Sequence, residues 1–180
     1  MRILHLTKED YRVGHWSGGS TTELFIWPEG ADYSTRQFRF RVSSAVVELE
    51  ESDFTPLQGV TRYITPLTGG FTLTHPDAQP VVMAPLDAPY RFSGEIPTHC
   101  VGKAADFNLM LKGVEGEMSL CRDQWQLRGG FHCLYAVEPT TVHLQQPMDL
   151  RPGETLVVFT DKPRSFAIAG NAIACWAELK

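Results

Sequence analysis

Short apolar segments alternate with clusters of turn-forming residues along the whole chain. Inside many of these segments, apolar and polar residues repeat with period two, which is typical of half-buried β-strands. No segment has the pattern of an amphipathic helix of three turns. The pattern therefore predicts an all-β protein, with strands at residues 3–6, 22–27, 37–49, 60–67, 71–74, 81–83, 98–101, 106–112, 117–121, 131–138, 141–145, 155–159, 165–168 and 172–179.

Two stretches with the same rhythm indicate an internal duplication. Residues 83–94 and 148–159 each place a proline-containing turn before a strand, as the double-stranded β-helix barrels called cupins do. We therefore expect a bicupin-like double β-barrel of the jelly-roll type. Residues 1–115 would form the first barrel, and residues 116–180 a smaller second barrel half, packed on the first in one compact body. A Gly-Gly pair at 69–70 is expected to form a hairpin turn.

Polar side chains interrupt the apolar pattern of two expected strands in a regular way. In residues 37–49, Arg41 and Ser43 share one face, while the opposite face carries phenylalanine and valine. In residues 106–112, Asp106 and Asn108 share a face, although both are poor strand formers. Such a face is exposed to solvent, marks a bulge or sheet edge, or lines a cavity where polar groups find partners. Periodicity leaves these interpretations open.

A third expected strand carries Arg62 on the same face as two aliphatic residues. Arginine is suited to planar, bidentate capture of a carboxylate. Arg41 and Arg62 facing one barrel interior would form an anion site. The alternative is a structural ion pair with Asp106 or Glu23, and the two arrangements are compatible with each other.

Residues 16–23 form a glycine-rich segment, in which Trp16 precedes two glycines and Glu23 follows three hydroxyl side chains. Glycine permits close approach of the backbone, so this segment can cradle a ligand or cap a barrel mouth. A plain connecting loop is the alternative. The segment is not a phosphate-binding loop, because the lysine of that motif is missing and no helix is expected after it.

Composition and charge exclude several classes of partner. The chain has 16 Lys and Arg residues against 21 Asp and Glu residues and no basic run, which argues against binding to nucleic acid. Its apolar stretches are too short to span a bilayer, and its first ten residues lack a signal-peptide core. The four cysteines show no CxxC spacing and are expected to be reduced. We therefore expect a cytoplasmic protein that does not bind a membrane.

The six histidines show neither HxH nor HExxH spacing. A cupin metal site needs two or three histidines and a carboxylate in its first barrel motif, whereas residues 59–64 read Gly-Val-Thr-Arg-Tyr-Ile. We therefore expect no metal and no other cofactor. Nucleophile motifs such as GxSxG are also missing, so no catalytic residue is assigned.

Five segments, taken in order, resemble the HutD/Ves family of cupin-like proteins: residues 16–23, 38–45, 54–62 with 67–70, 92–95 and 106–110. The resemblance implies a metal-free bicupin fold. It also implies a role, in some bacteria, in histidine utilisation, as a regulator that binds an intermediate such as N-formylglutamate. Family motif positions are occupied here by Glu23, Arg41, Ser43, Arg62, Asp106 and Asn108. The first motif lacks the asparagine and third glycine that often follow its tryptophan, so this mouth loop can hold a different ligand.

These features predict a non-catalytic protein that binds a small carboxylate. The predicted site has arginines for the carboxylate, polar groups for an amide or formyl group and an aromatic cover: Arg41, Arg62, Asn108, Ser43, Asp106, Glu23, Trp16 and Phe92. One alternative is a cupin-type isomerase or hydrolase that uses Glu23 or Asp106 as general base. The other is an interaction module whose strands pair with another subunit, such as a second copy in a homodimer.

Overall fold

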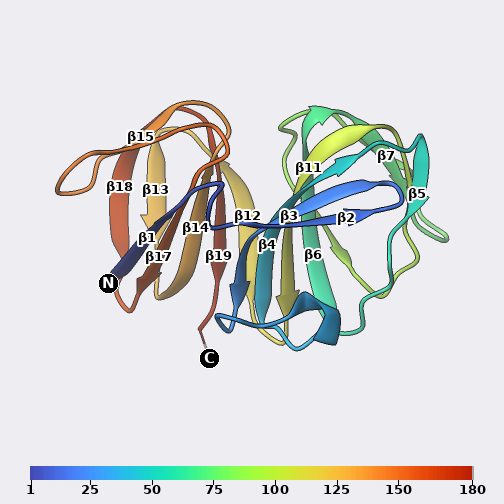
Figure 1. Cartoon of the computed structure of the whole chain (residues 1–180), viewed down its shortest axis with the longest axis horizontal. Coiled ribbons are helices and arrows are strands. Elements are labelled where there is room, and N and C mark those ends of the chain that lie inside the picture. The colour runs from blue at the N-terminus through green and yellow to red at the C-terminus, as the bar shows by residue number, and fades with distance from the viewer. Residues whose placement is uncertain (180) are drawn as a thin grey trace. The chain divides into compact units, whose positions relative to one another are not determined.

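The computed structural model describes residues 1–179, whose regular secondary structure is almost entirely β-strand (Figure 1). It contains strands β1 to β19 and one helical turn, the 3-10 helix η1 at Tyr33–Thr35. The expected all-β class is confirmed. No helix among residues 1–179 is long and apolar enough to cross a membrane. The chain divides into two units: the N-unit, residues 12–113, and the C-unit, residues 1–11 together with the chain from residue 114 onward.

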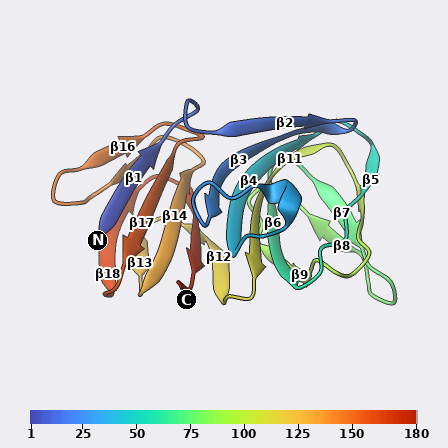
Figure 2. The same ribbon diagram turned by 60° about the horizontal axis from the view of Figure 1, so that its bottom comes forward.

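The N-unit consists of two antiparallel sheets. The larger sheet has the order β2-β3-β4-β11-β6-β9, and the smaller sheet has the order β5-β10-β7-β8. Strand β2 lies at the edge of the larger sheet beside β3 (Figure 2). The strands are β2 (Arg12–Trp16), β3 (Gly19–Trp27), β4 (Phe40–Val47), β5 (Glu51–Asp53), β6 (Val60–Gly69), β7 (Phe71–Thr74), β8 (Val81–Met83), β9 (Tyr90–Ser93), β10 (His99–Val101) and β11 (Ala104–Lys112).

The C-unit also consists of two antiparallel sheets, with the orders β1-β17-β14-β19-β12 and β13-β18-β15-β16. The first strand of the chain, dark blue in Figure 1, lies along β17 at the edge of the larger sheet. The strands are β1 (Arg2–Leu6), β12 (Gly116–Cys121), β13 (Gln124–Leu127), β14 (Gly130–Ala136), β15 (Thr140–Val142), β16 (Met148–Leu150), β17 (Thr155–Thr160), β18 (Arg164–Ala169) and β19 (Ala172–Ala177).

The two units share one strand order. The sheets β4-β11-β6-β9 and β5-β10-β7-β8 of the N-unit become β12-β19-β14-β17 and β13-β18-β15-β16 when every strand number is raised by eight. This is the double-sheet topology of a jelly roll. The proline turns that share a rhythm in the sequence precede β9 and β17, which hold the same place in this order. The duplication in the sequence therefore coincides with a duplication of topology.

The start of the chain departs from the expected division at residue 115. Strand β1 pairs with β17, and Ile3 packs against the core of the C-unit. The Tyr11 hydroxyl donates a hydrogen bond to the Thr155 hydroxyl at 2.8 Å. Residues 1–11 therefore complete the C-unit, because the exposed edge of β17 offers unpaired backbone groups that β1 satisfies.

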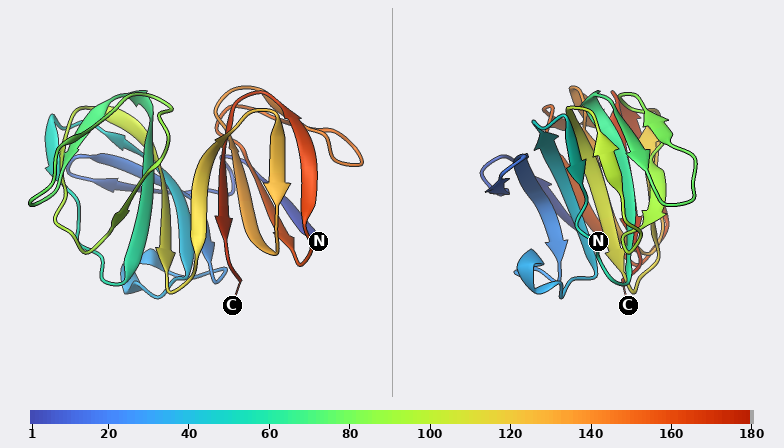
Figure 3. Two further views of the ribbon diagram at one scale, coloured as in Figure 1. Left: turned by 180° about the vertical axis from the view of Figure 1, so that it is seen from behind. Right: turned by 90° about the vertical axis from the view of Figure 1, so that its right-hand side faces the viewer.

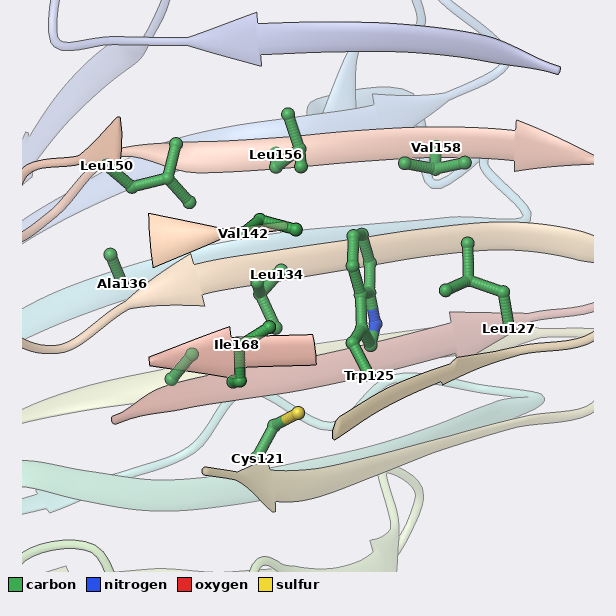
Figure 4. Packing of buried hydrophobic residues seen from close by; sticks show 11 residues of the cluster. Cys121, Trp125, Leu127, Leu134, Ala136, Val142, Leu150, Leu156, Val158 and Ile168 are labelled. Atoms are coloured by element: carbon green, nitrogen blue, oxygen red, sulfur yellow. The ribbon is translucent and has the colours of Figure 1, made fainter. Parts of the chain in front are cut away.

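Each unit has its own apolar core between its two sheets. In the C-unit, Trp125 lies among leucine, isoleucine and valine side chains from both sheets (Figure 4). In the N-unit, one cluster contains Ile64, Leu73 and Phe92, and a second contains Ile26 and Val60. Apolar burial of this kind is the main source of stability in each unit.

Several local expectations need correction. Gly69 and Gly70 do not form a hairpin turn, because β6 pairs with β9 and β11, whereas β7 pairs with β8 and β10. The chain changes sheets at this point, and a Cβ at residue 69 would lie 2.4 Å from the Lys103 carbonyl oxygen. Strands β2, β5, β9, β13 and β16 are not among the predicted strand ranges. Strand β2 is exposed along its whole length, so its sequence shows no apolar face.

Candidate functional site

A cavity of about 580 Å³ opens in the N-unit. Strands β2, β3, β4, β6 and β11 of the larger sheet contribute to its wall, together with the segment that carries η1 and residues 52–57. This volume is typical of a site for a small molecule. The cavity lies entirely within one unit, so its geometry is described by that unit alone.

Strands β4 and β11 turn the predicted polar faces into the cavity. Arg41 and Ser43 of β4, and Asp106 and Asn108 of β11, all line it, although each is less than 7% exposed. The two strands pair directly, with Asn108 opposite Ser43. Of the interpretations that periodicity left open, a polar lining of a cavity holds for both strands, and a bulge also lies beside Asp106.

Arg41 is surrounded by partners. Its Nε donates a hydrogen bond to Glu23 Oε2 at 2.7 Å in a mostly buried ion pair. Its Nη1 donates to the Ser43 hydroxyl at 3.2 Å. Its guanidinium also lies over the Tyr33 ring, 4.0 Å from the ring centroid. These contacts compensate the positive charge and hold the guanidinium in one position.

Glu23 reaches Arg41 because of an irregularity in the backbone. The pairing of β3 with β4 shifts register between Glu23 and Phe25, so one extra residue is accommodated there. A β-bulge of this kind re-aims neighbouring side chains. A second register shift lies beside Asp106, in the pairing of β11 with β6. Glu23 and Asp106, the acidic cavity residues on β3 and β11, therefore both stand next to bulges.

Arg62 has a different environment. It is 7% exposed, and its Nη2 donates a hydrogen bond to Asn108 Oδ1 at 3.2 Å. Its guanidinium lies over the rings of Phe54 and Phe92, at 4.5 and 5.3 Å from their centroids. Burial lowers the pKa of Arg62, because the charged form loses hydration. Among residues 1–179 no carboxylate forms an ion pair with Arg62, and its buried Nε has no hydrogen-bond partner.

Asp106 and Asn108 form a pair on β11. The Asn108 amide nitrogen donates a hydrogen bond to Asp106 Oδ1, while the amide oxygen accepts from Arg62. Burial raises the pKa of Asp106 to about 7, and the nearby Arg62 charge and the Asn108 hydrogen bond oppose this rise only in part. Asp106 is therefore a carboxyl group that changes charge near neutral pH.

The two predicted aromatic covers lie in different places. Trp16 stands at the cavity wall, 42% exposed, with its ring against Gly18. A Cβ at residue 18 would lie 2.1 Å from that ring, so the mouth loop needs glycine there. Phe92 does not line the cavity; it is buried against Arg62 and His75. Its expected role as a cover is corrected to that of a support for Arg62.

The segment around η1 contributes cavity residues that the sequence pattern did not reveal. Tyr33 lines the cavity, and its ring lies between the guanidinium groups of Arg36 and Arg41, each 4.0 Å from the centroid. Asp32 caps η1 by accepting from the Ser34 amide at 2.8 Å. This blue helical turn follows β3 (Figure 3). It is an irregular segment, so no periodicity could point to it.

The described part of the chain offers no metal centre. Among residues 1–179, no group of three His, Cys, Asp or Glu side chains comes together in a way that could hold a metal ion. The cavity lining carries guanidinium, carboxyl, amide, hydroxyl, phenol and imidazole groups.

Comparisons with known proteins agree with this architecture. A family model described as HutD matches residues 8–176, whereas no curated protein sequence matches significantly. HutD from Pseudomonas fluorescens SBW25 is similar in structure, with a TM-score of 0.85, 22% identity and coverage of 99% of this chain and 100% of that one. The conserved protein of unknown function PA5104 from Pseudomonas aeruginosa PAO1 has a TM-score of 0.84, 24% identity and coverage of 99% and 98%.

More distant structures have the same fold. The bacterial pirin YhhW from Escherichia coli, solved in complex with nickel(II), has a TM-score of 0.64, 8% identity and coverage of 98% of this chain and 99% of that one. The expected cupin-like double β fold is therefore confirmed. At these identities the structural likeness concerns the fold, and the cavity residues must be judged on their own chemistry.

Proposed function

Because the chain belongs to the HutD family and its N-unit holds an arginine-lined cavity, we propose that it binds a small organic carboxylate. One observation carries this proposal: Arg62 is a buried cation with an unpartnered Nε and no ion-pair partner among residues 1–179. A buried charge without a counterion is costly, and a carboxylate entering the cavity would supply that counterion.

The rest of the cavity supports an organic ligand with further polar groups. Asn108 and Ser43 can hydrogen-bond an amide or formyl group, and Trp16 supplies an apolar wall at the mouth. The resemblance to the HutD/Ves family suggests an intermediate of histidine degradation as the ligand, and N-formylglutamate is the candidate. We propose that the protein senses or sequesters such a compound in a regulatory role.

A thermal-shift screen of histidine-degradation intermediates and simple carboxylates tests the proposal. A ligand present at ~100 times its dissociation constant adds roughly 2.7 kcal/mol to the free energy of unfolding. We expect a clear rise in Tm with at least one carboxylate, and loss of that rise in Arg62→Ala. No rise with any compound would refute the proposed function.

Two exposed arginines serve as matched controls. Arg91 lies on β9, and Arg39 directly precedes β4; neither lines the cavity. Arg91→Ala and Arg39→Ala change the net charge as Arg62→Ala does, but they leave the cavity intact. A ligand-induced shift that Arg91→Ala abolishes as completely as Arg62→Ala would show that the effect comes from overall charge.

A second candidate function rests on Asp106. A carboxyl group with a pKa of about 7 inside a cavity suits general acid–base catalysis, as a cupin-type isomerase or hydrolase would need. Incubation of each bound carboxylate with the protein, followed by NMR of the solution, distinguishes the two functions. An enzyme converts the ligand and loses this conversion in Asp106→Asn, whereas a binding protein returns the ligand unchanged.

A further inference from the structure

The two cavity arginines differ in their partners: Arg41 forms an ion pair with a carboxylate of the protein, and Arg62 does not. From this difference we infer that the cavity selects ligands with a single carboxylate, which binds Arg62, and that Arg41 is a structural cation. The inference rests on the proposed function and narrows its ligand class. It also revises the expectation that Arg41 and Arg62 together form one anion site.

Arg41 is already neutralised inside the protein. Glu23 accepts its Nε hydrogen bond at 2.7 Å, and Ser43 accepts from its Nη1. The Tyr33 ring covers one face of the guanidinium. A second ligand carboxylate at this place would meet the Glu23 carboxylate, and like charges at close range repel in a poorly hydrated site.

Arg62 lacks the carboxylate partner that Arg41 has. Its one hydrogen-bond acceptor is the neutral amide oxygen of Asn108. The guanidinium also lies over the rings of Phe54 and Phe92, which supply no negative charge. The side chain is more than nine-tenths buried and lines the cavity, and its Nε has no hydrogen-bond partner. A ligand carboxylate at the guanidinium would therefore supply charge compensation that the protein leaves incomplete.

The remaining charges do not favour a second anionic group. Arg12 and Arg36 at the cavity wall are not buried, and the wall also carries Asp32 and Asp53. Deeper in the cavity, Asp106 is the one acidic lining residue besides Glu23. Among residues 1–179, Arg62 is thus the buried lining cation that forms no ion pair, and one ligand carboxylate would supply that partner.

Matched ligand pairs test the inference directly. Each pair has the same skeleton and differs in one carboxylate, which is replaced by an amide: succinate and succinamate, glutarate and glutaramate, N-formylglutamate and N-formylglutamine. Isothermal titration at pH 6.5 gives both dissociation constants. We expect the monocarboxylate of the best-binding pair to bind at least about tenfold more tightly than its dicarboxylate.

The variant Glu23→Gln sharpens the test, because it keeps a hydrogen-bond acceptor near Arg41 but removes the charge. In this variant the dicarboxylate is expected to gain about tenfold in affinity, while the monocarboxylate changes by less than about threefold. Glu29→Gln is the matched control, since Glu29 is exposed and does not line the cavity. Circular dichroism checks that each variant is folded. The ratio of the two dissociation constants measured on the wild-type protein tests the inference even if a variant does not fold.

The outcomes separate this inference from the proposed function. A wild-type protein that binds the dicarboxylate as tightly as the monocarboxylate, or more tightly, overturns the single-carboxylate inference and leaves carboxylate binding in place. If ligand binding survives in Arg62→Met but disappears in Arg41→Met, Arg41 binds the ligand carboxylate. This result also overturns the single-carboxylate inference. Failure of all six compounds to bind at 10 mM (roughly the weakest affinity worth assigning to a site) refutes the proposed function and the inference together.

Discussion

The N-unit and the C-unit share a strand order and fill it in different ways. In the N-unit, strands β4, β6 and β11 turn arginine, serine, aspartate and asparagine into the interior. In the C-unit, the corresponding strands β12, β14 and β19 contribute cysteine, leucine and alanine to a closed apolar core around Trp125. Since the topology is common to both, it is the residues on the inward faces that decide whether a barrel becomes a site or a structural body.

The polar interior of the N-unit lowers its stability relative to an apolar one. An apolar interior stabilises the fold by burial, whereas buried charges need partners and lose hydration. In the N-unit, the Arg41–Glu23 ion pair and the Asn108 hydrogen bonds compensate the lost hydration of the buried polar groups. At Arg62 this compensation is incomplete, because its Nε has no hydrogen-bond partner. Under the proposed function, a ligand carboxylate would complete this compensation.

The largest expected effect concerns the apolar interior of the C-unit. Trp125 is 1% exposed and lies at the centre of that core. Trp125→Ala is expected to lower the free energy of unfolding by about 3–5 kcal/mol, because it removes a large buried side chain and leaves a void. Trp16→Ala, at the N-unit cavity, should cost less than about 1 kcal/mol. Urea denaturation measures both, and equal losses would contradict the contrast.

The next effect concerns the buried acid of the N-unit. The pKa of Asp106 in the folded protein, about 7, lies above its value in the unfolded chain. The contribution of Asp106 to stability is therefore full below about pH 4 and is lost as the pH rises to 7. Asp106→Asn removes this dependence and should gain on the order of 2–4 kcal/mol relative to wild type between pH 4.5 and 8. Parallel pH profiles of wild type and variant, measured by urea denaturation, would contradict the burial of a titrating carboxyl.

A smaller effect distinguishes the ion pairs of the two units. Glu23→Ala leaves a mostly buried Arg41 without its counterion and should cost about 1–3 kcal/mol. The Glu117–Arg128 pair of the C-unit joins Oε1 and Nη2 at 3.0 Å, but both side chains are more than half exposed. Glu117→Ala should therefore cost less than about 1 kcal/mol. Chemical denaturation of the two variants at one pH compares them, and a larger loss for Glu117→Ala would reverse the ranking.

The smallest effect concerns ligand affinity. A bound carboxylate disfavours a second negative charge nearby, so ligand binding should raise the pKa of Asp106 further above 7. Affinity is then expected to fall above pH 7, by up to about tenfold per pH unit. Titration calorimetry from pH 6 to 9 measures this slope, and Asp106→Asn should flatten it. A slope that persists in the variant would assign the titration to another group.

A large part of the polar wall was predictable from periodicity alone. The period-two pattern placed Arg41 with Ser43, and Asp106 with Asn108, on shared faces, and each pair lines the cavity. The same reasoning did not find Tyr33, because η1 lies in an irregular segment between β3 and β4. It also misplaced Phe92, since the register of a single short strand does not reveal whether an inward-facing ring meets a cavity or another side chain.

The amino-acid sequence by itself determined the all-β class, the family and the faces on which the polar side chains lie, because these depend on local alternation and on motifs within single segments. Only the tertiary structure decided which arginine is paired. That choice depends on a bulge that turns Glu23 toward Arg41, on η1 laying Tyr33 over it, and on two aromatic rings that bury Arg62. Partners of this kind come from segments far apart in the chain, and their distances and hydration exist only after folding.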